Sequence, residues 1–238
     1  MVVVTVGGPR GGGREEVAQE VAQLLRAELV DREAMAREAQ RLAGAPREEM
    51  AKRFEQGPAG GRLARAVQAF LERSATAGSA GDPFLGPTGV EILLSRSVQE
   101  AAAPATTPKQ ELDDRRYLEV LTLVTREVAA AGNVVIVGGG SQFILRDSPG
   151  ALRVYSTASL KDRVRRAMEA EHLDEAAAAR LVKEADEARR AWVKKYFKAD
   201  VDDHLLYDVT INTSILPVKV AGLMLAEAAR AKQRLFSG

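Results

Sequence analysis

A short run of apolar, mostly β-branched residues at positions 2–6 leads directly into the glycine-rich segment GGPRGGGR at positions 7–14. An amphipathic stretch follows, with Val17, Val21 and Leu24 on one helical face. This order constrains the fold, because a helix start leaves backbone N–H groups unpaired and glycines let the preceding loop curl these donors around an anion. The sequence therefore predicts a strand, a phosphate-binding loop and a helix.

The loop fits the glycines of the phosphate-loop pattern GxxxxGK[ST] and departs from it at the next two positions. Arg14 stands where the pattern has Lys, and Glu15 stands where a hydroxyl would bind Mg²⁺. A guanidinium can hold phosphate bidentately, whereas a carboxylate repels phosphate unless it turns outward or reaches a metal. A turn that only joins a strand to a helix is the alternative. The predicted phosphate-binding residues are Gly8, Pro9, Arg10, Gly11, Gly12, Gly13 and Arg14.

Composition excludes several classes of protein. The 238 residues include no cysteine, so disulfides, thiolate metal sites and a cysteine nucleophile are ruled out. The apolar run at the start is too short for a signal peptide core or a membrane span. The net charge of +1, from 34 basic and 33 acidic residues, argues against a broad nucleic-acid surface. We expect a cytoplasmic protein that binds neither membranes nor nucleic-acid polymers, and an oligomer is compatible with the sequence.

Apolar segments separated by helical patterns indicate a three-layer α/β architecture with a parallel sheet. The segment at 134–137 is apolar on both faces, as expected of a parallel strand covered by helices on either side. The five predicted strands lie at residues 2–6, 29–31, 134–137, 152–156 and 209–211.

Helical spacing accounts for most of the remaining chain. Glycine and proline at 57–61 break a two-helix region, residues 75–89 read as an irregular loop, and residues 101–108 read as a soft linker. Asp174 has the character of an N-cap, and Gly132 and Asn133 form a helix stop. The predicted helices are 15–27, two within 33–77, 112–131, 161–170, a charged one after Asp174 to about 198, and 218–236.

Six ordered motifs along the chain resemble the cytidylate-kinase-like family of nucleoside monophosphate kinases. They are GGPRGGGR at 7–14, VDR at 30–32, GNVVIVG at 132–138, LRVY at 152–155, DRVRR at 162–166 and YDVTINT at 207–213. The resemblance implies one P-loop domain over 1–238, with a five-stranded parallel sheet, a helical acceptor-binding insertion at 33–110 and a basic helical lid at 172–200.

The resemblance also implies roles for individual residues. Gly-Gly-Arg at the end of the loop is a common form in that family, which makes Arg14 a donor-phosphate ligand. Asp31 and Arg32 fall near the expected acceptor nucleotide, and Asp186 matches the lid pattern together with Arg189. The residues that would supply positive charge to the transferred phosphoryl group are Arg14, Arg163, Arg189 and Lys194.

One departure from the family follows the third strand. The family usually has Gly-Arg-Gly or Gly-Arg-Asp there, with the arginine on the acceptor phosphate, whereas this chain has Gly138, Gly139 and Gly140. The three glycines can offer N–H donors to a substrate, but they carry no cation. Transfer activity is therefore in question more than nucleotide binding is.

Simpler structural readings remain open for the charged residues. The arginines at 163–166 fit a solvated helix face, Arg189 and Lys194 fit surface ion pairs, and Asp31 fits a helix cap. The two histidines, His172 and His204, lack ligand-like spacing, so no metal site built by the protein is expected.

The leading functional hypothesis is an ATP-dependent kinase of nucleoside monophosphates, with CMP or dCMP as the acceptor implied by the resemblance. ATP would carry Mg²⁺, which the nucleotide and water would mainly hold. A nucleotide-binding regulatory protein without transfer activity is the alternative, and a small-molecule kinase with a non-nucleotide acceptor is the third.

Overall fold

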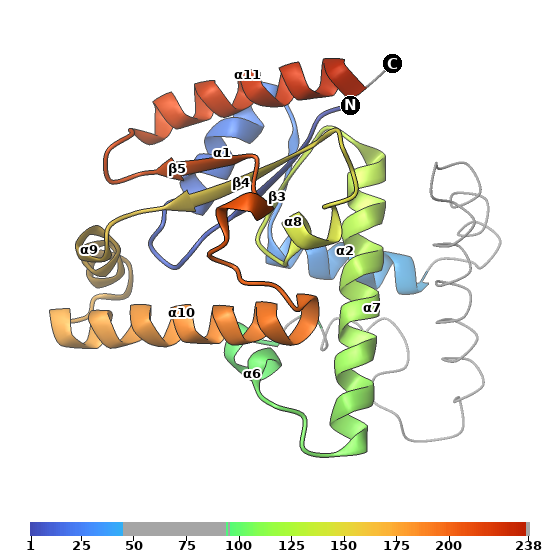
Figure 1. Cartoon of the computed structure of the whole chain (residues 1–238), viewed down its shortest axis with the longest axis vertical. Helices are drawn as coiled ribbons and strands as arrows, with labels where there is room; N and C mark the ends of the chain where they lie inside the picture. Colours follow the sequence, from blue (N-terminus) through green and yellow to red (C-terminus); the bar gives the residue numbers. More distant parts are fainter. Residues whose placement is uncertain (45–93, 95, 237–238) are drawn as a thin grey trace. The chain divides into compact units, whose positions relative to one another are not determined.

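The computed structural model describes residues 1–44, 94 and 96–236 (Figure 1). The chain divides into two compact units. The first comprises Met1–Asp31, Ser97–Pro104 and Ala131–Gly238, and the second comprises Arg32–Arg96 and Ala105–Ala130. The predicted helix break at 57–61 and irregular loop at 75–89 lie outside the described residues.

The first unit is built on the predicted five-stranded parallel sheet. Its strands are β1 (Val3–Gly7), β2 (Glu28–Val30), β3 (Val134–Val137), β4 (Ala151–Thr157) and β5 (Val209–Asn212). They lie in the order β2-β3-β1-β4-β5, and every neighbouring pair is parallel. The central strand β1 is therefore flanked by β3 and β4, which places the loops after β1, β3 and β4 at one edge of the sheet.

Helices cover both faces of the sheet, which makes the architecture three-layered as predicted. Val4 and Val6 of β1 point into a core formed with α1 (Arg14–Leu25) and α11 (Val218–Phe236). The short helix α8 (Ser141–Ile144) contacts β1 from the opposite face, where a Cβ on Gly7 would meet the Gln142 side chain at 3.2 Å. The connections after β1 and β3 thus leave toward opposite faces, the arrangement that opens a binding crevice in parallel sheets.

The remaining helices follow the predicted pattern closely. Asp174 caps α10 through its side chain, which accepts from the Ala177 amide at 2.7 Å. Positive φ values at Gly132 and Asn133 end the helix before β3. These helices are α2 (Arg32–Gly44), α7 (Pro108–Ala131), α9 (Leu160–Glu171) and α10 (Glu175–Phe197). The 3-10 turn η1 (His204–Leu206) was not predicted, and the second helix predicted within 33–77 lies outside the described residues.

The predicted soft linker at 101–108 is partly wrong. Residues 98–102 form the helix α6 (Val98–Ala102), and α7 already begins at Pro108. Ser97 and Glu100 make a capping box, in which each side chain accepts from the other residue's backbone N–H. The sequence signal Ser-x-x-Glu was present at 97–100 and is typical of a helix start.

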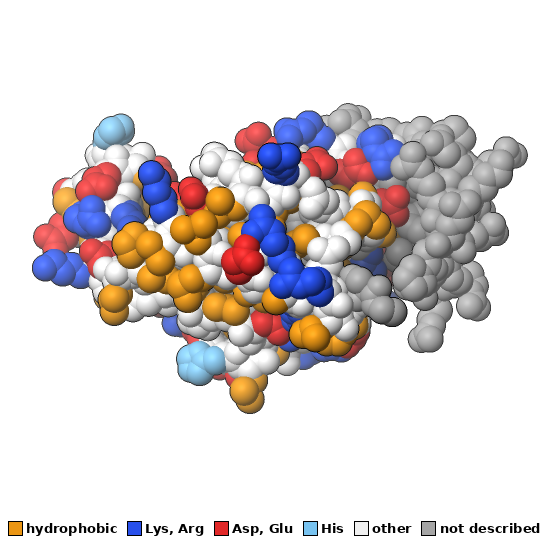
Figure 2. Space-filling model, turned by 90° about the horizontal axis from the view of Figure 1, so that it is seen from above, with side chains coloured by type: hydrophobic (Ala, Val, Ile, Leu, Met, Phe, Trp, Pro, Cys, Tyr) orange, Lys and Arg blue, Asp and Glu red, His pale blue; other side chains and the backbone are white. Residues whose placement is uncertain are grey.

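Helix α11 is amphipathic in the manner that its sequence predicts. Ala221 and Leu225 are buried against α1 and the sheet, whereas Val220, Leu223 and Met224 face outward and are exposed. Figure 2 shows the apolar side chains gathered on this face of the molecule. No helix in the described part of the chain combines the length and apolarity needed to cross a membrane.

Asp208 bonds Arg153 of β4 and Lys232 of α11, and we expect it to make the free energy of unfolding depend on pH. Burial acts to raise the pKa of Asp208, but hydrogen bonds from Arg153 and Lys232 outweigh it and lower the pKa to about 2. A carboxylate whose pKa is lowered on folding stabilises the protein at pH values above its unfolded pKa, about 3.9. This stabilisation disappears as the pH falls from about 4 to 2.

Replacement Asp208→Asn should therefore lower the free energy of unfolding by about 1 kcal/mol at pH 7. The difference from the wild type should shrink below about pH 4. Urea unfolding at a series of pH values measures both. The exposed pair partner Asp147 is the control, since Asp147→Asn should change little at any pH. If the free energy of unfolding of Asp208→Asn stayed below that of the wild type by the same amount down to pH 2, the lowered pKa of Asp208 would be contradicted.

Candidate phosphate-binding site

The glycines of the loop after β1 are required by close backbone contacts. A Cβ on Gly8 would lie 2.1 Å from the carbonyl oxygen of Ser156, and a Cβ on Gly12 would lie 2.8 Å from the same oxygen. Gly13 has a φ of 77° and occupies the N-cap position of α1. The loop is thus pressed against the end of β4 in a conformation that other residues cannot adopt without strain.

Side chains hold the carbonyl groups of this loop from several directions. The donors come from α1, the end of β4, helix α9 and the turn after β5. The bonds run from Arg14 to Gly8 O (3.1 Å), from Arg163 Nε to Arg10 O (2.9 Å), from Arg166 to Gly11 O (2.8 Å) and from Ser156 Oγ to Gly12 O (2.7 Å). The Thr213 hydroxyl lies 3.1 Å from Gly12 O as well.

Holding the carbonyls fixes the direction of the neighbouring N–H groups. The peptide bonds are trans, so the oxygen of one residue and the N–H of the next point in opposite directions. The N–H of Gly12 closes a turn onto Pro9 O at 3.0 Å. The amides of Gly11, Gly13 and Arg14 make no hydrogen bond with any residue that the structure describes. These three donors lie at the positive end of α1, an arrangement that suits an anion.

Arg14 lies beside these three amides, and its side chain is held by a weak, exposed ion pair. Its Nε donates to Glu15 at 2.7 Å, and Glu15 turns outward with 62% of its side chain exposed. An exposed ion pair of this kind contributes little free energy, so Arg14 can exchange Glu15 for a phosphate. The side chain of Arg10 pairs with Glu171 at the end of α9.

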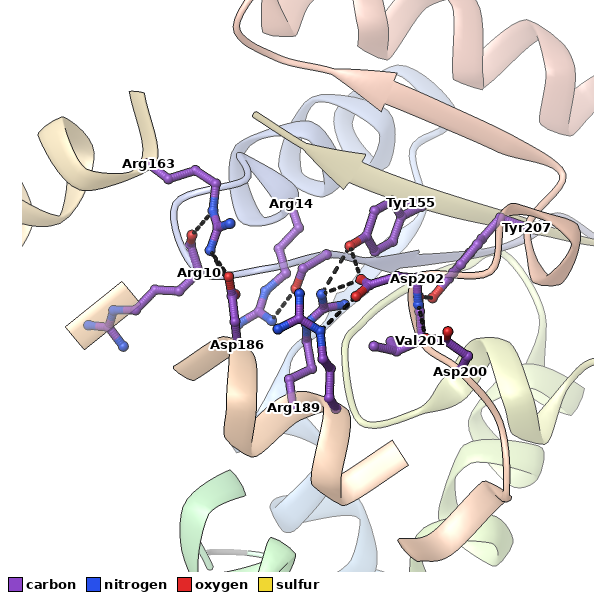
Figure 3. A network of polar contacts seen from close by, with 12 residues as sticks. Arg10, Arg14, Tyr155, Arg163, Asp186, Arg189, Asp200, Val201, Asp202 and Tyr207 are labelled. Carbon is purple, nitrogen blue, oxygen red and sulfur yellow. Dashed lines mark hydrogen bonds and ion pairs between the residues drawn. The ribbon is translucent and has the colours of Figure 1, made fainter. Parts of the chain in front are cut away.

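Arg163 is buried and Arg166 is half-buried, in contrast to the simpler structural reading of this helix. Arg163 is 8% exposed and donates through NH2 to both carboxylate oxygens of Asp186, at 2.7 and 2.8 Å. Arg166 bonds the Thr213 hydroxyl and carbonyl at 2.8 and 3.0 Å. Arg165, between them, is exposed and pairs with Asp162 and Glu169 on its own helix. Figure 3 shows Arg163 reaching Arg10 and Asp186.

Arg189 occupies a second group of contacts beside the loop (Figure 3). Its side chain is 14% exposed, its guanidinium lies 5.5 Å from the centre of the Tyr155 ring, and its NH2 bonds Tyr155 and Asp202 at 3.0 Å each. Tyr155 is the register partner of Gly7, which brings this network to the base of the loop. Two further nitrogens of Arg189, Nε and NH1, are buried without a partner among the described residues.

The groups around Arg189 are one carboxylate and two phenols with shifted pKa values. Burial acts to raise the pKa of Asp202, but hydrogen bonds and charges of Arg190 and Arg189 outweigh it and lower the pKa. Burial raises the pKa of Tyr155 and of Tyr207, so both phenols stay protonated near neutral pH. Asp202 is therefore an anion that orients Arg189, whose Nε and NH1 keep unused hydrogen-bonding capacity among the described residues.

The three glycines after β3 all adopt left-handed backbone conformations. Gly138, Gly139 and Gly140 have φ values of 69°, 59° and 68°. A Cβ on Gly140 would lie 2.7 Å from the Phe197 ring, whereas a Cβ on Gly138 would meet nothing within 4 Å. Because β3 is next to β1 in the sheet, these glycines lie at the same edge as the phosphate loop.

Asp31, Arg32 and Lys194 stay predicted site residues, and their described surroundings are different. Asp31 directly precedes α2 and Arg32 is its first residue, with Nε and NH2 each 3.4 Å from Leu94 O. Arg32 belongs to the second unit. Lys194 is exposed. Five residues along a helix amount to about 140° of rotation, so Lys194 and Arg189 point to different sides of α10.

Sequence reasoning missed four residues that shape the site, namely Ser156, Thr213, Tyr155 and Asp202. Three of them lie in or beside motifs already singled out at 152–155 and 207–213, but nothing in the sequence showed which atoms they would contact. Asp202 had no local signal, because its partners Arg189 and Tyr155 come from two other elements.

The described residues do not form a metal site of their own. No cluster of three or more His, Asp or Glu side chains suited to a metal occurs among them. Glu15, which replaces the hydroxyl residue of the phosphate-loop pattern, is exposed and paired with Arg14. The donor set therefore does not fit protein-built coordination of Mg²⁺.

Taken together, a parallel sheet with a glycine loop after its central strand and free amides at the following helix defines a P-loop type of α/β protein. The chain belongs to the cytidylate kinase-like family, whose family model matches residues 3–215. This match confirms the resemblance found in the sequence motifs and places the protein in a kinase-like family.

Two solved structures match the chain at low sequence identity, and the first of them shares its architecture. An uncharacterized protein from Eubacterium ventriosum matches with a TM-score of 0.58 and 18% identity, over 97% of this chain and 98% of that one. A shikimate kinase from Bacteroides thetaiotaomicron matches with a TM-score of 0.45 and 14% identity, over 96% and 98%. The second likeness is too distant to inform fold or function. No curated protein matches the chain.

Proposed function

We propose that this protein is a phosphotransferase of the nucleoside monophosphate kinase type, with ATP as the phosphoryl donor. The observation that carries the proposal is the set of amides of Gly11, Gly13 and Arg14, which make no hydrogen bond with the described residues while the loop carbonyls are held by side chains. Such donors suit the phosphates of a nucleotide because they need no reorganisation when the anion arrives.

Two arginines complete the proposed site. Arg14 follows the loop directly, and Arg189 approaches from α10 with Nε and NH1 buried and unpartnered among the described residues. Phosphoryl transfer requires positioning and positive charge around the oxygens of the transferred group more than covalent chemistry. We assign Arg14 to the donor phosphates and Arg189 to the transferred group. Mg²⁺ would enter with ATP, and no step assigned to this chain depends on it.

A coupled assay of ADP release with a panel of acceptors tests the proposal. The panel contains CMP, dCMP, the other nucleoside monophosphates and shikimate, each at saturating ATP and Mg²⁺. We expect turnover with at least one monophosphate. Turnover confined to shikimate, or none above the no-acceptor background, would contradict the assignment to this class of kinase.

Replacement Arg14→Ala should weaken ATP binding by about 10- to 100-fold, since a charge-assisted contact to phosphate is lost. The fold should remain intact, because Arg14 is partly exposed and pairs, among the described residues, with the exposed Glu15. Isothermal titration calorimetry measures the affinity. Arg146→Ala, at an exposed arginine paired with Asp147, is the control. Equal affinities of the Arg14 variant and the wild type would place the triphosphate elsewhere.

A nucleotide-binding protein without transfer activity is the second candidate. It is favoured by Gly139, which stands where the family usually has an acceptor-binding arginine and has a left-handed φ of 59°. The same assay separates the two functions, because this candidate predicts ATP binding by calorimetry together with no turnover for any acceptor.

A further inference from the structure

We infer that Arg163 is a positioning residue that aims the Gly11 amide at the bound phosphate and does not itself contact the phosphate. The inference rests on the proposed function, since it concerns how the same loop binds its anion. It assigns to Arg163 a different role from the direct charge that its basic helix suggests.

The contacts of Arg163 account for this role. Its Nε donates to Arg10 O at 2.9 Å, and its NH2 is held by both oxygens of Asp186. In the trans peptide that joins residues 10 and 11, fixing the oxygen on Arg163 directs the Gly11 N–H away from Arg163. A Cβ on Gly11 would lie 2.8 Å from the Arg163 carbonyl, so the loop and α9 are also in direct contact.

Charge supports the same conclusion. The Arg163–Asp186 pair is largely buried, with side chains 9% and 13% exposed, and it carries no net charge as a pair. Arg163 therefore contributes geometry and little net field. Asp186 acts through Arg163, because the guanidinium is held at NH2 by the carboxylate and at Nε by Arg10 O, which together fix its orientation.

Replacement Asp186→Asn distinguishes positioning from direct contact, because the two roles predict opposite signs. Removing a negative charge near an anion site should strengthen ATP binding if Arg163 were a phosphate ligand restrained by Asp186. If Arg163 orients the loop, the variant should bind ATP and inorganic tripolyphosphate about 10-fold more weakly. Arg163→Lys should weaken binding similarly, since lysine keeps the charge but has one nitrogen where arginine contacts Arg10 O and Asp186 through two.

The matched control is Arg165→Ala, which removes an exposed arginine from the same helix and should leave both affinities unchanged. Calorimetry on the full chain gives the affinities, and hydrogen exchange of the ligand-free protein over residues 8–16 reports the loop. We expect faster exchange there in the Asp186 and Arg163 variants. Should Asp186→Asn fail to fold, Arg163→Met combined with Asp186→Leu removes both charges together and is expected to weaken binding equally.

Tighter or unchanged ATP binding by the folded Asp186 variant, or recovery of wild-type affinity by Arg163→Lys, would overturn the inference. If the wild type binds neither ATP nor tripolyphosphate, the proposed function fails, and loop exchange alone then decides the inference. Exchange of residues 8–16 that is the same in the wild type and the Asp186 variant would refute it.

Discussion

Arg189→Met is expected to lower kcat about 100- to 1000-fold with little change in the KM for ATP. Arg189 is held by Asp202 and Tyr155 while two of its buried nitrogens have no partner among the described residues. A preorganised cation aimed at developing charge stabilises the transition state more than the ground state, and its removal costs about 3 to 4 kcal/mol. Steady-state kinetics with the best acceptor of the panel measures both constants.

The adjacent Arg190 provides a matched control. Arg190 also bonds Asp202, at 2.8 Å, but 55% of its side chain is exposed, compared with 14% for Arg189. Arg190→Met should therefore reduce kcat by less than about 10-fold. Equal losses in both variants would mean that the arginines act only by holding Asp202, and an unchanged kcat in Arg189→Met would remove Arg189 from the catalytic site.

Gly8→Ala is expected to weaken ATP binding at least 100-fold. The added methyl group would lie 2.1 Å from the carbonyl oxygen of Ser156, which is backbone and cannot rotate away. The loop must shift, and its carbonyl contacts with Ser156 and Arg163 would shift with it. Strain of this kind also costs about 1 to 3 kcal/mol of stability.

Calorimetry with ATP and thermal unfolding measure the two effects of this substitution. Gly150→Ala serves as the control, because its Cβ would find its nearest neighbour, Phe236, at 3.9 Å and its φ is not positive. That variant should bind ATP normally. Wild-type affinity in Gly8→Ala would show that the contact with β4 does not define the loop.

Much of the fold was predictable because local patterns and the sheet agree. The segment at 134–137 is apolar on both faces and forms β3 over the same residues, and the charged helix begins after Asp174 as its capping signal indicates. Strand ends shifted by one residue, as at β1, where Gly7 still pairs with Tyr155. The linker prediction at 101–108 was wrong only at its two ends: residues 101 and 102 belong to α6, which the capping box before them favours, and α7 begins at Pro108.

The candidate site was predictable only in part. The loop could be placed from its glycines, since a turn from strand to helix needs their backbone freedom. The partners of its arginines could not, because Arg163 meets Asp186 across 23 residues and Arg10 O across 153. Basic residues that follow a helical pattern look alike in sequence whether they face water, a phosphate or a backbone carbonyl. Only tertiary contacts separate Arg163 from the exposed Arg165.

Titration of ¹⁵N-labelled protein with ATP, followed by NMR, tests the central claim most directly. Amide signals of Gly11, Gly13 and Arg14 should move downfield by the largest amounts and saturate together, because each N–H gains a charged acceptor. Inorganic tripolyphosphate should reproduce these shifts. The account would be contradicted if ATP bound saturably but left the three amide signals unshifted, with the largest chemical-shift changes elsewhere in the chain.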